Sequence, residues 1–209
     1  MSFGSIDLEG ILGALGGCGF FGLLIAFVIV MAVWGEKRRR ALHERWVGWA
    51  AARGVALSGS YPMVQITGTL HGVGIQVVTH KFRHRTRRGH RTSYKHEVIA
   101  TPLVSIGDLA LSREGFFASI GKSFGGQDIQ VGDPAFDAAF VVRSANEHAA
   151  RAVLTPAVCA ALLDAQRTLG EVYVESGGVR SMRQGTASPD TVDVPLDAVA
   201  RAAAAFGRP

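Results

Sequence analysis

The sequence predicts an α+β protein with one amino-terminal transmembrane helix, followed by a mainly antiparallel β-sheet domain with two or three packed helices. Three observations support this expectation. An uncharged apolar run occupies residues 11–34, basic residues follow it directly, and alternating β-branched segments are then mixed with capped helical ones. With 209 residues, the chain has room for one span and one domain of about 150 to 170 residues.

The apolar run is long enough to cross a bilayer as a helix. A helix rises about 1.5 Å per residue, and about 20 residues cross a hydrocarbon core of about 30 Å. Residues 1–10 form a short extracytoplasmic tail whose only charges are Asp7 and Glu9. The run is followed by the basic residues Lys37, Arg38, Arg39 and Arg40. Because basic flanks stay on the cytoplasmic side, we expect a single-pass inner-membrane protein with its carboxyl-terminal domain in the cytoplasm.

Other interpretations of the amino terminus fit less well. A cleaved signal peptide begins with a basic region, and this one is acidic. A lipidated Cys18 would follow its apolar run, but most of the run comes after it. The spacing of Gly13 and Gly17 can let two membrane helices pack closely, which allows a homo-oligomer through the span; the alternative is that glycine is simply common in membrane helices.

Residues 35–54 are expected to form a basic juxtamembrane helix that ends at Gly54. Trp46 and Trp49 share its apolar face. They suit the lipid headgroup region, but packing on the domain sheet is the favoured interpretation. Residues 55–209 then form the cytoplasmic α+β domain.

Within this domain, alternation predicts a meander and capping signals predict helices. Strands are expected at 63–70, 72–82, 94–103, 108–112 and 134–143, with loops at 83–93 and 113–133. A short helix is expected at 146–152. Thr155-Pro156 predicts a helix start and Gly170 its end. A hairpin at 171–183 and a final helix at about 194–206, with Pro195 in its first turn, complete the chain.

The most unusual stretch is residues 80–96, which contains four histidines and no acidic residue. Its basic residues are Lys81, Arg83, Arg85, Arg87, Arg88, Arg91 and Lys95. Near anionic lipid headgroups, each such residue contributes about 1 kcal/mol. The alternatives are a solvated loop, or an acidic partner or nucleic acid with Phe82 or Tyr94 stacking on a base, although nucleic acid is not the expected partner.

No cofactor, metal or catalytic residue is expected. His80 and His84 lack nearby cysteine or carboxylate ligands. Gly121-Lys122-Ser123 lacks the first glycine of a phosphate loop, because Phe116 stands at that position. An enzyme remains an alternative, with its site in the Gly/Asp-rich segment 107–137, which contains Asp108, Asp128, Asp133 and Asp137.

Residues 136–182 resemble the carboxyl half of a bacterial family of membrane-anchored proteins of unknown function. The resemblance depends on Phe136, Asp137, Phe140 and Val142, then on Leu154-Thr155-Pro156 and the hairpin that follows. It implies a cytoplasmic α+β domain tied to a membrane, and it carries over no catalytic residue.

Together these observations predict a binding protein, an adaptor or scaffold, that acts on an unknown protein partner at the anionic inner leaflet. The competing functions are an enzyme that uses segment 107–137 and a membrane tether for nucleic acid that uses the basic hairpin 81–95.

Overall fold

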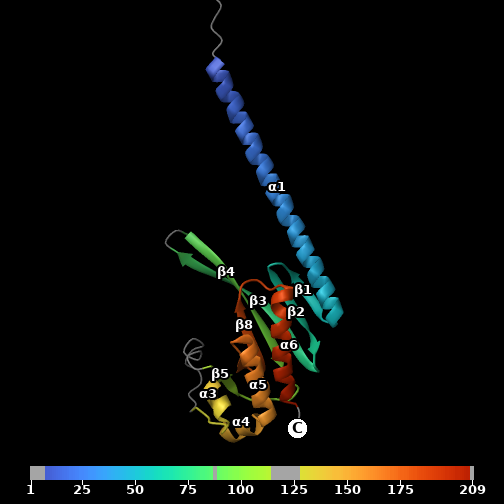
Figure 1. Cartoon of the computed structure of the whole chain (residues 1–209), viewed down its shortest axis with the longest axis vertical. Coiled ribbons are helices and arrows are strands. Elements are labelled where there is room, and N and C mark those ends of the chain that lie inside the picture. Colours follow the sequence, from blue (N-terminus) through green and yellow to red (C-terminus); the bar gives the residue numbers. More distant parts are fainter. Residues whose placement is uncertain (1–7, 87–88, 114–127, 208–209) are drawn as a thin grey trace, which may run out of the picture. The chain divides into compact units, whose positions relative to one another are not determined.

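The computed structural model describes residues 8–86, 89–113 and 128–207 (Figure 1). The chain divides into two compact units, Met1–Glu44 and Arg45–Pro209, and each is described by itself. Helix α1 (Leu8–Arg53) contributes residues to both units.

In the first unit, α1 is continuous from Leu8 and includes the residues predicted to span a membrane. Every large apolar side chain from Leu24 to Trp34 is between 48% and 65% exposed. Among the described residues, no helix offers a stretch long and apolar enough to cross a bilayer. The predicted span falls partly on residues 11–23, whose side chains lie outside the described residues.

The second unit is built on one sheet, in which all the strand pairs are antiparallel. The strand order is β1-β2-β3-β4-β8-β7-β5-β6. The strands are β1 (Ala56–Ser60), β2 (Met63–Leu70), β3 (Val73–Thr86), β4 (Gly89–Thr101), β5 (Ala110–Ser112), β6 (Val141–Arg143), β7 (Tyr173–Glu175) and β8 (Gly178–Gln184). The prediction of an α+β domain with an antiparallel sheet is confirmed.

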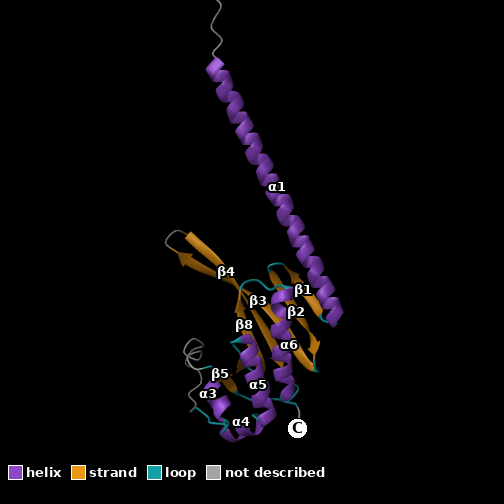
Figure 2. Ribbon diagram, viewed as in Figure 1, coloured by secondary structure: helices purple, strands orange, loops and turns teal. Residues whose placement is uncertain are grey.

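The helices of this unit are α3 (Pro134–Ala139), α4 (Glu147–Val153), α5 (Pro156–Leu169) and α6 (Pro189–Ala205). Figure 2 shows α5 and α6 lying together over the sheet, and α6 contacts β3, β4 and β8. Along β3, the buried residues Val73, Ile75 and Val77 alternate with less buried ones. This alternation follows from the two-residue period of a strand, and it places the core between the sheet and the two helices.

The carboxyl end of α1 packs into the same core. Trp46 is buried, and its ring meets Trp49 edge-on with ring centroids 5.4 Å apart. Trp49 Nε1 donates a hydrogen bond to Asp193 at 3.1 Å, and Arg53 forms an ion pair with the same carboxylate. The prediction that these tryptophans pack on the domain is therefore confirmed for Trp46.

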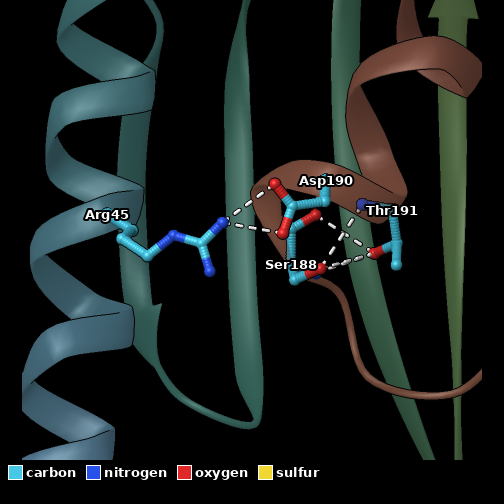
Figure 3. Close-up of polar contacts among 4 residues, drawn as sticks. All are labelled: Arg45, Ser188, Asp190 and Thr191. Carbon is cyan, nitrogen blue, oxygen red and sulfur yellow. Dashed lines mark hydrogen bonds and ion pairs between the residues drawn. The ribbon is translucent and has the colours of Figure 1, made fainter.

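Helix α6 begins at Pro189, earlier than the expected start near residue 194. Ser188 caps it through a capping box, because its side chain accepts a hydrogen bond from the Thr191 backbone while the Thr191 hydroxyl accepts one from the Ser188 backbone (Figure 3). Asp190 in the first turn forms a two-oxygen ion pair with Arg45, at 2.7 and 2.8 Å. Pro195 consequently lies inside the helix rather than in its first turn.

Two further predictions were wrong. Residues 134–143 do not form one strand, because Asp133 accepts hydrogen bonds from the backbones of Ala135 and Phe136 and so caps α3. Only Val141–Arg143 is extended. Residues 83–93 are not a loop: β3 continues to Thr86 and β4 begins at Gly89, with an unbroken register between them. Strand β1 was not predicted at all.

Candidate functional site: a basic ribbon and a buried carboxylate

Strands β3 and β4 extend together beyond their neighbours in the sheet (Figure 1). Pairing with β2 stops at Val78, and pairing with β8 stops at Lys95. In the described part of the chain, residues 81–86 and 89–94 pair only with each other. We call residues 81–95 the basic ribbon.

The register of the ribbon sorts its side chains onto two faces, since directly paired residues share a face. One face carries the cations Lys81, Arg83 and Arg85. The other carries His80, Phe82 and His84 in a row, with ring centroids 6.4 Å apart in each successive pair. Their partners across the ladder on this second face are Lys95, Ser93 and Arg91.

The cations of the ribbon are available to an external anion. Lys81, Arg83, Arg85 and Arg91 are exposed, and within the described residues none of them forms an ion pair. The ammonium of Lys95 lies 5.5 Å from the centroid of the Phe82 ring. Phe82 itself is 37% exposed, so the ribbon offers an aromatic ring among positive charges. Arg87 and Arg88 lie outside the described residues.

The second predicted basic cluster, Lys37, Arg38, Arg39 and Arg40, lies on α1 in the first unit. Arg40 Nε donates to Glu36 Oε1 at 3.0 Å, one turn earlier, and this pair is exposed. The Arg38 guanidinium carbon lies 5.8 Å from the centroid of the Trp34 ring. Exposed pairs of this kind are weak, so this cluster keeps most of its positive charge for a partner.

At the root of the ribbon, a carboxylate is buried in the sheet. Glu97 on β4 is 6% exposed. Its Oε1 accepts hydrogen bonds from the Tyr173 hydroxyl at 2.7 Å and from Arg180 Nη1 at 3.1 Å. Its Oε2 lies 3.2 Å from His80 Nε2. We call Glu97, Tyr173, Arg180 and His80 the carboxylate cluster.

These contacts decide the charge state of Glu97. Burial raises the pKa of its carboxyl, but the hydrogen bonds from Tyr173 and Arg180, the positive charge of Arg180 and the contact with His80 outweigh burial. The pKa of Glu97 is therefore below its ordinary value, and the side chain is ionised at neutral pH. Burial and the hydrogen bond to Glu97 together raise the pKa of Tyr173, so this hydroxyl stays protonated as a donor.

Sequence reasoning missed the carboxylate cluster. Its members come from strands β3, β4, β7 and β8, and they meet only through the sheet order β3-β4-β8-β7. Arg180 is paired with Ile99 on one side and with Tyr173 on the other. A lone acidic residue after a basic stretch was the one signal available in the sequence.

The carboxylates of the segment 107–137 hold the backbone in place. Asp133 caps α3, and Asp137 accepts hydrogen bonds from the backbones of Val131 and Gly132 at 2.8 and 3.0 Å. Asp108 accepts from the Ser144 hydroxyl and the Ala145 backbone, both at 2.6 Å, and the first of these bonds holds its pKa below the ordinary value.

The remaining carboxylate, Asp128, accepts from the Val142 backbone at 3.3 Å. All four side chains therefore accept hydrogen bonds from backbone N–H groups: Asp133 and Asp137 from nearby residues, and Asp108 and Asp128 from segments farther along the chain. Residues 114–127, which include the Gly121-Lys122-Ser123 sequence, lie outside the described residues.

The one cysteine among the described residues is a poor nucleophile. Cys159 is buried, and burial raises the pKa of its thiol to about 11, so little thiolate forms at neutral pH. Among the residues that the structure describes, no group of three or more His, Cys, Asp or Glu side chains could hold a metal ion.

Comparison with known proteins adds little. No protein-family model matches the chain, and a search of curated proteins found no match. One solved structure, the mycobacterial trehalose monomycolate transport factor A (TtfA), is similar at 14% identity and a TM-score of 0.45. The match covers 79% of this chain and 94% of TtfA. The resemblance stated for residues 136–182 stays a prediction. Its first motif, Phe136 to Val142, was expected as a strand but forms the end of α3 and the start of β6.

Proposed function

We propose that the chain is a single-pass, membrane-anchored binding protein that acts as an adaptor or scaffold, with its α+β domain held at an anionic lipid surface by the basic ribbon. The observation that carries the proposal is the ribbon itself. It presents Lys81, Arg83, Arg85 and Arg91 to solvent on a two-stranded extension, and none of them has an ion-pair partner in the described parts of the chain.

The magnitude of this attraction is sufficient for membrane docking. Each basic side chain near an anionic surface contributes about 1 kcal/mol, so a few of them together contribute several kcal/mol at moderate salt. An exposed aromatic ring such as Phe82 suits the headgroup region, where one edge of the ring is dry and the other is wet. The ribbon then needs no preformed pocket to bind a surface.

The membrane anchor is supported by α1. Large apolar side chains from Leu24 to Trp34 are exposed along the helix, and a contiguous apolar surface of this kind marks a contact with lipid or another protein. In the sequence, the uncharged run continues back to residue 11, and the basic residues at 37–40 follow it. By this charge bias we place the domain in the cytoplasm.

Nucleic acid is the second candidate ligand, and one observation favours it. The rings of Phe82 and His84 lie nearly parallel, with 19° between their planes, among the cations of the ribbon, and the bases of single-stranded nucleic acid stack on aromatic rings in such positive surroundings. The enzyme alternative has less support, since the described carboxylates of segment 107–137 already accept hydrogen bonds from backbone N–H groups.

Hydrogen exchange on the full chain in lipid nanodiscs tests the proposal. We expect the backbone amides of residues 81–95 to exchange at least about threefold more slowly in nanodiscs rich in an anionic lipid than in neutral ones, because a docked ribbon is shielded from water. The variant Arg83→Gln/Arg85→Gln/Arg91→Gln will lose this difference.

The matched control is Arg151→Gln/Arg167→Gln/Arg201→Gln. It removes the same charge from exposed arginines on α4, α5 and α6, each paired within its own helix, and it will keep the difference. Protection that is the same in neutral and anionic lipid contradicts the proposal. Protection by a single-stranded oligonucleotide, without any effect of anionic lipid, establishes the second candidate instead.

The anchor is tested separately. We expect the chain to stay in the membrane pellet after washing with high salt and alkali, and the domain to resist protease added outside intact cells. Extraction by alkali, or digestion of the domain from outside, contradicts the topology.

A further inference from the structure

A pocket of about 450 Å³ lies beside the root of the basic ribbon. Ligand pockets usually measure about 300 to 1,000 Å³, so it has room for a small molecule or a headgroup. Its lining residues are Lys95, Leu169, Glu171, Met182, Arg183 and Gln184.

The pocket exists because β8 is longer than the strand beside it. Strand β7 pairs with β8 only over Gly178–Arg180, so the edge of residues 181–184 is not taken by a strand in the described residues. The segment between α5 and β7 lies along this edge instead, where the Ser181 hydroxyl donates to the Glu171 carbonyl at 2.8 Å. A cleft therefore remains between the end of β8 and the end of α5.

Positive charge enters the pocket from the two paired strands. Lys95 on β4 lies directly opposite Gln184 on β8 and shares a face of the sheet with it. Arg183, the preceding residue on β8, belongs to the other face, and both cations line the pocket at the edge of β8. Arg183 Nη2 lies 3.5 Å from the Leu169 carbonyl, which places its guanidinium at the carboxyl end of α5. Neither Lys95 nor Arg183 forms an ion pair with any residue that the structure describes.

Negative charge comes from Glu171. It is exposed and, in the described chain, likewise forms no ion pair. It lies two residues after Leu169, the last residue of α5. Leu169 and Met182 supply apolar surface to the same pocket.

A ligand that uses all of these groups carries an anion and a cation a few atoms apart. We infer that the pocket binds a phosphoethanolamine group, with its phosphate at Lys95 and Arg183 and its ammonium at Glu171. Gln184 can donate a further hydrogen bond to the phosphate, and the glycerol carbons lie against Leu169 and Met182. The inference deepens the proposed function and rests on it, since it identifies a headgroup that is bound beside the ribbon.

Titration of the full chain in a neutral detergent with soluble headgroups tests the pocket without a bilayer. We expect glycerophosphoethanolamine to bind at least about tenfold more tightly than glycerol 3-phosphate or ethanolamine alone, because each half leaves one charged wall unpaired. Arg183→Gln and Glu171→Gln will each weaken binding by about fivefold or more.

The control variants make the same charge changes away from the pocket. Arg151→Gln and Glu147→Gln break an exposed pair on α4 and will leave the affinity unchanged. Lys95→Gln is a second test on the cationic wall and will also weaken binding, and thermal unfolding of each variant confirms that it is folded. Equal affinity for glycerol 3-phosphate and the full headgroup overturns the inference, as does the absence of binding.

Nanodiscs distinguish a lipid headgroup from a free one. Slower exchange of residues 169–171 and 182–184 in phosphatidylethanolamine than in phosphatidylcholine supports the lipid as the source, because a trimethylammonium cannot donate hydrogen bonds to Glu171. Binding of the soluble headgroup without this difference supports a free ligand. If anionic lipid does not slow hydrogen exchange at residues 81–95 while the headgroup still binds in the titration, the ribbon's role in the proposed function is refuted. The inference about the pocket is then unaffected.

Discussion

Replacing Tyr173 with phenylalanine tests whether hydrogen bonds hold Glu97 ionised inside the sheet. The change removes a hydroxyl that donates to Glu97 Oε1 at 2.7 Å and keeps the ring. A hydrogen bond to a charged group contributes about 1.5 to 3 kcal/mol, and water replaces the lost donor poorly at a carboxylate that is 6% exposed. We expect Tyr173→Phe to lower the free energy of unfolding by this amount near pH 7, which lowers the Tm by roughly 3 to 12 °C.

The loss depends on pH in a defined direction. The folded pKa of Glu97 is below its ordinary value of 4.5, so its ionised form stabilises the fold above pH 4.5. That contribution is lost as the pH falls through the folded pKa. Removing the Tyr173 hydroxyl raises the folded pKa of Glu97, because one of the hydrogen bonds that counteract the effect of burial is lost. The stability difference between the wild type and Tyr173→Phe is therefore largest near pH 7 and shrinks as the pH is lowered.

Denaturant unfolding of the full chain in a neutral detergent measures these values, with the fluorescence of the buried Trp46 as the signal. Tyr61→Phe is the matched control, because the Tyr61 hydroxyl is exposed and lies 3.4 Å from the Thr186 hydroxyl. We expect the control to lose no more than about 0.5 kcal/mol. Equal losses in the two variants, or a Tyr173→Phe loss that is the same near pH 4 and near pH 7, refute the reasoning.

Two further predictions concern His96 and the start of α6. Burial of His96, which is 2% exposed, and the positive charge of Arg183 lower the pKa of His96 below 6.5. Stability falls as the pH drops below 6.5, since the unfolded chain takes up the proton at a higher pH than the folded chain does. We expect His96→Gln to reduce this fall, measured as the change in denaturant midpoint with pH. A fall that is unchanged in the variant contradicts the assignment to His96. Ser188→Ala lowers the free energy of unfolding by about 1 kcal/mol at any salt concentration, because it removes the cap of α6. Arg45→Gln lowers it by at most about 1 kcal/mol, and by less at high salt, because it removes an exposed ion pair. A loss in Ser188→Ala that high salt abolishes argues against the capping box.

Local signals predicted the helices that begin with an unambiguous cap. Thr155 caps α5 through the Val158 backbone, and Gly170 ends it in the left-handed conformation with φ of 75°. Both features could be predicted from the sequence, because a helix cap depends only on residues that are close together in the chain. The start of α6 was predicted too late in the chain, because Pro195 was interpreted as a first-turn proline. Ser188-Pro189, the actual cap and first residue, carries the same kind of signal.

Non-local contacts account for what could not be predicted. Residues 83–93 of the basic ribbon were expected as a loop, since their cations show little apolar alternation, yet the strands are fixed by a continuous register with each other. That these basic residues bind an anionic surface stays a prediction. Glu97 was passed over, because only the order of strands across the sheet brings Tyr173 and Arg180 to it.

The positions of the strand ends affect self-association. The outer strands β1 and β6 are short, at five and three residues, so they give a second copy little edge to pair with. Among the described residues, the long edges without a further paired strand belong to the ribbon, where Lys and Arg side chains oppose stacking of one copy on another by charge repulsion. We therefore expect the arginines that we propose to bind lipid also to oppose aggregation, and apolar replacements at these positions to increase aggregation, measured by light scattering.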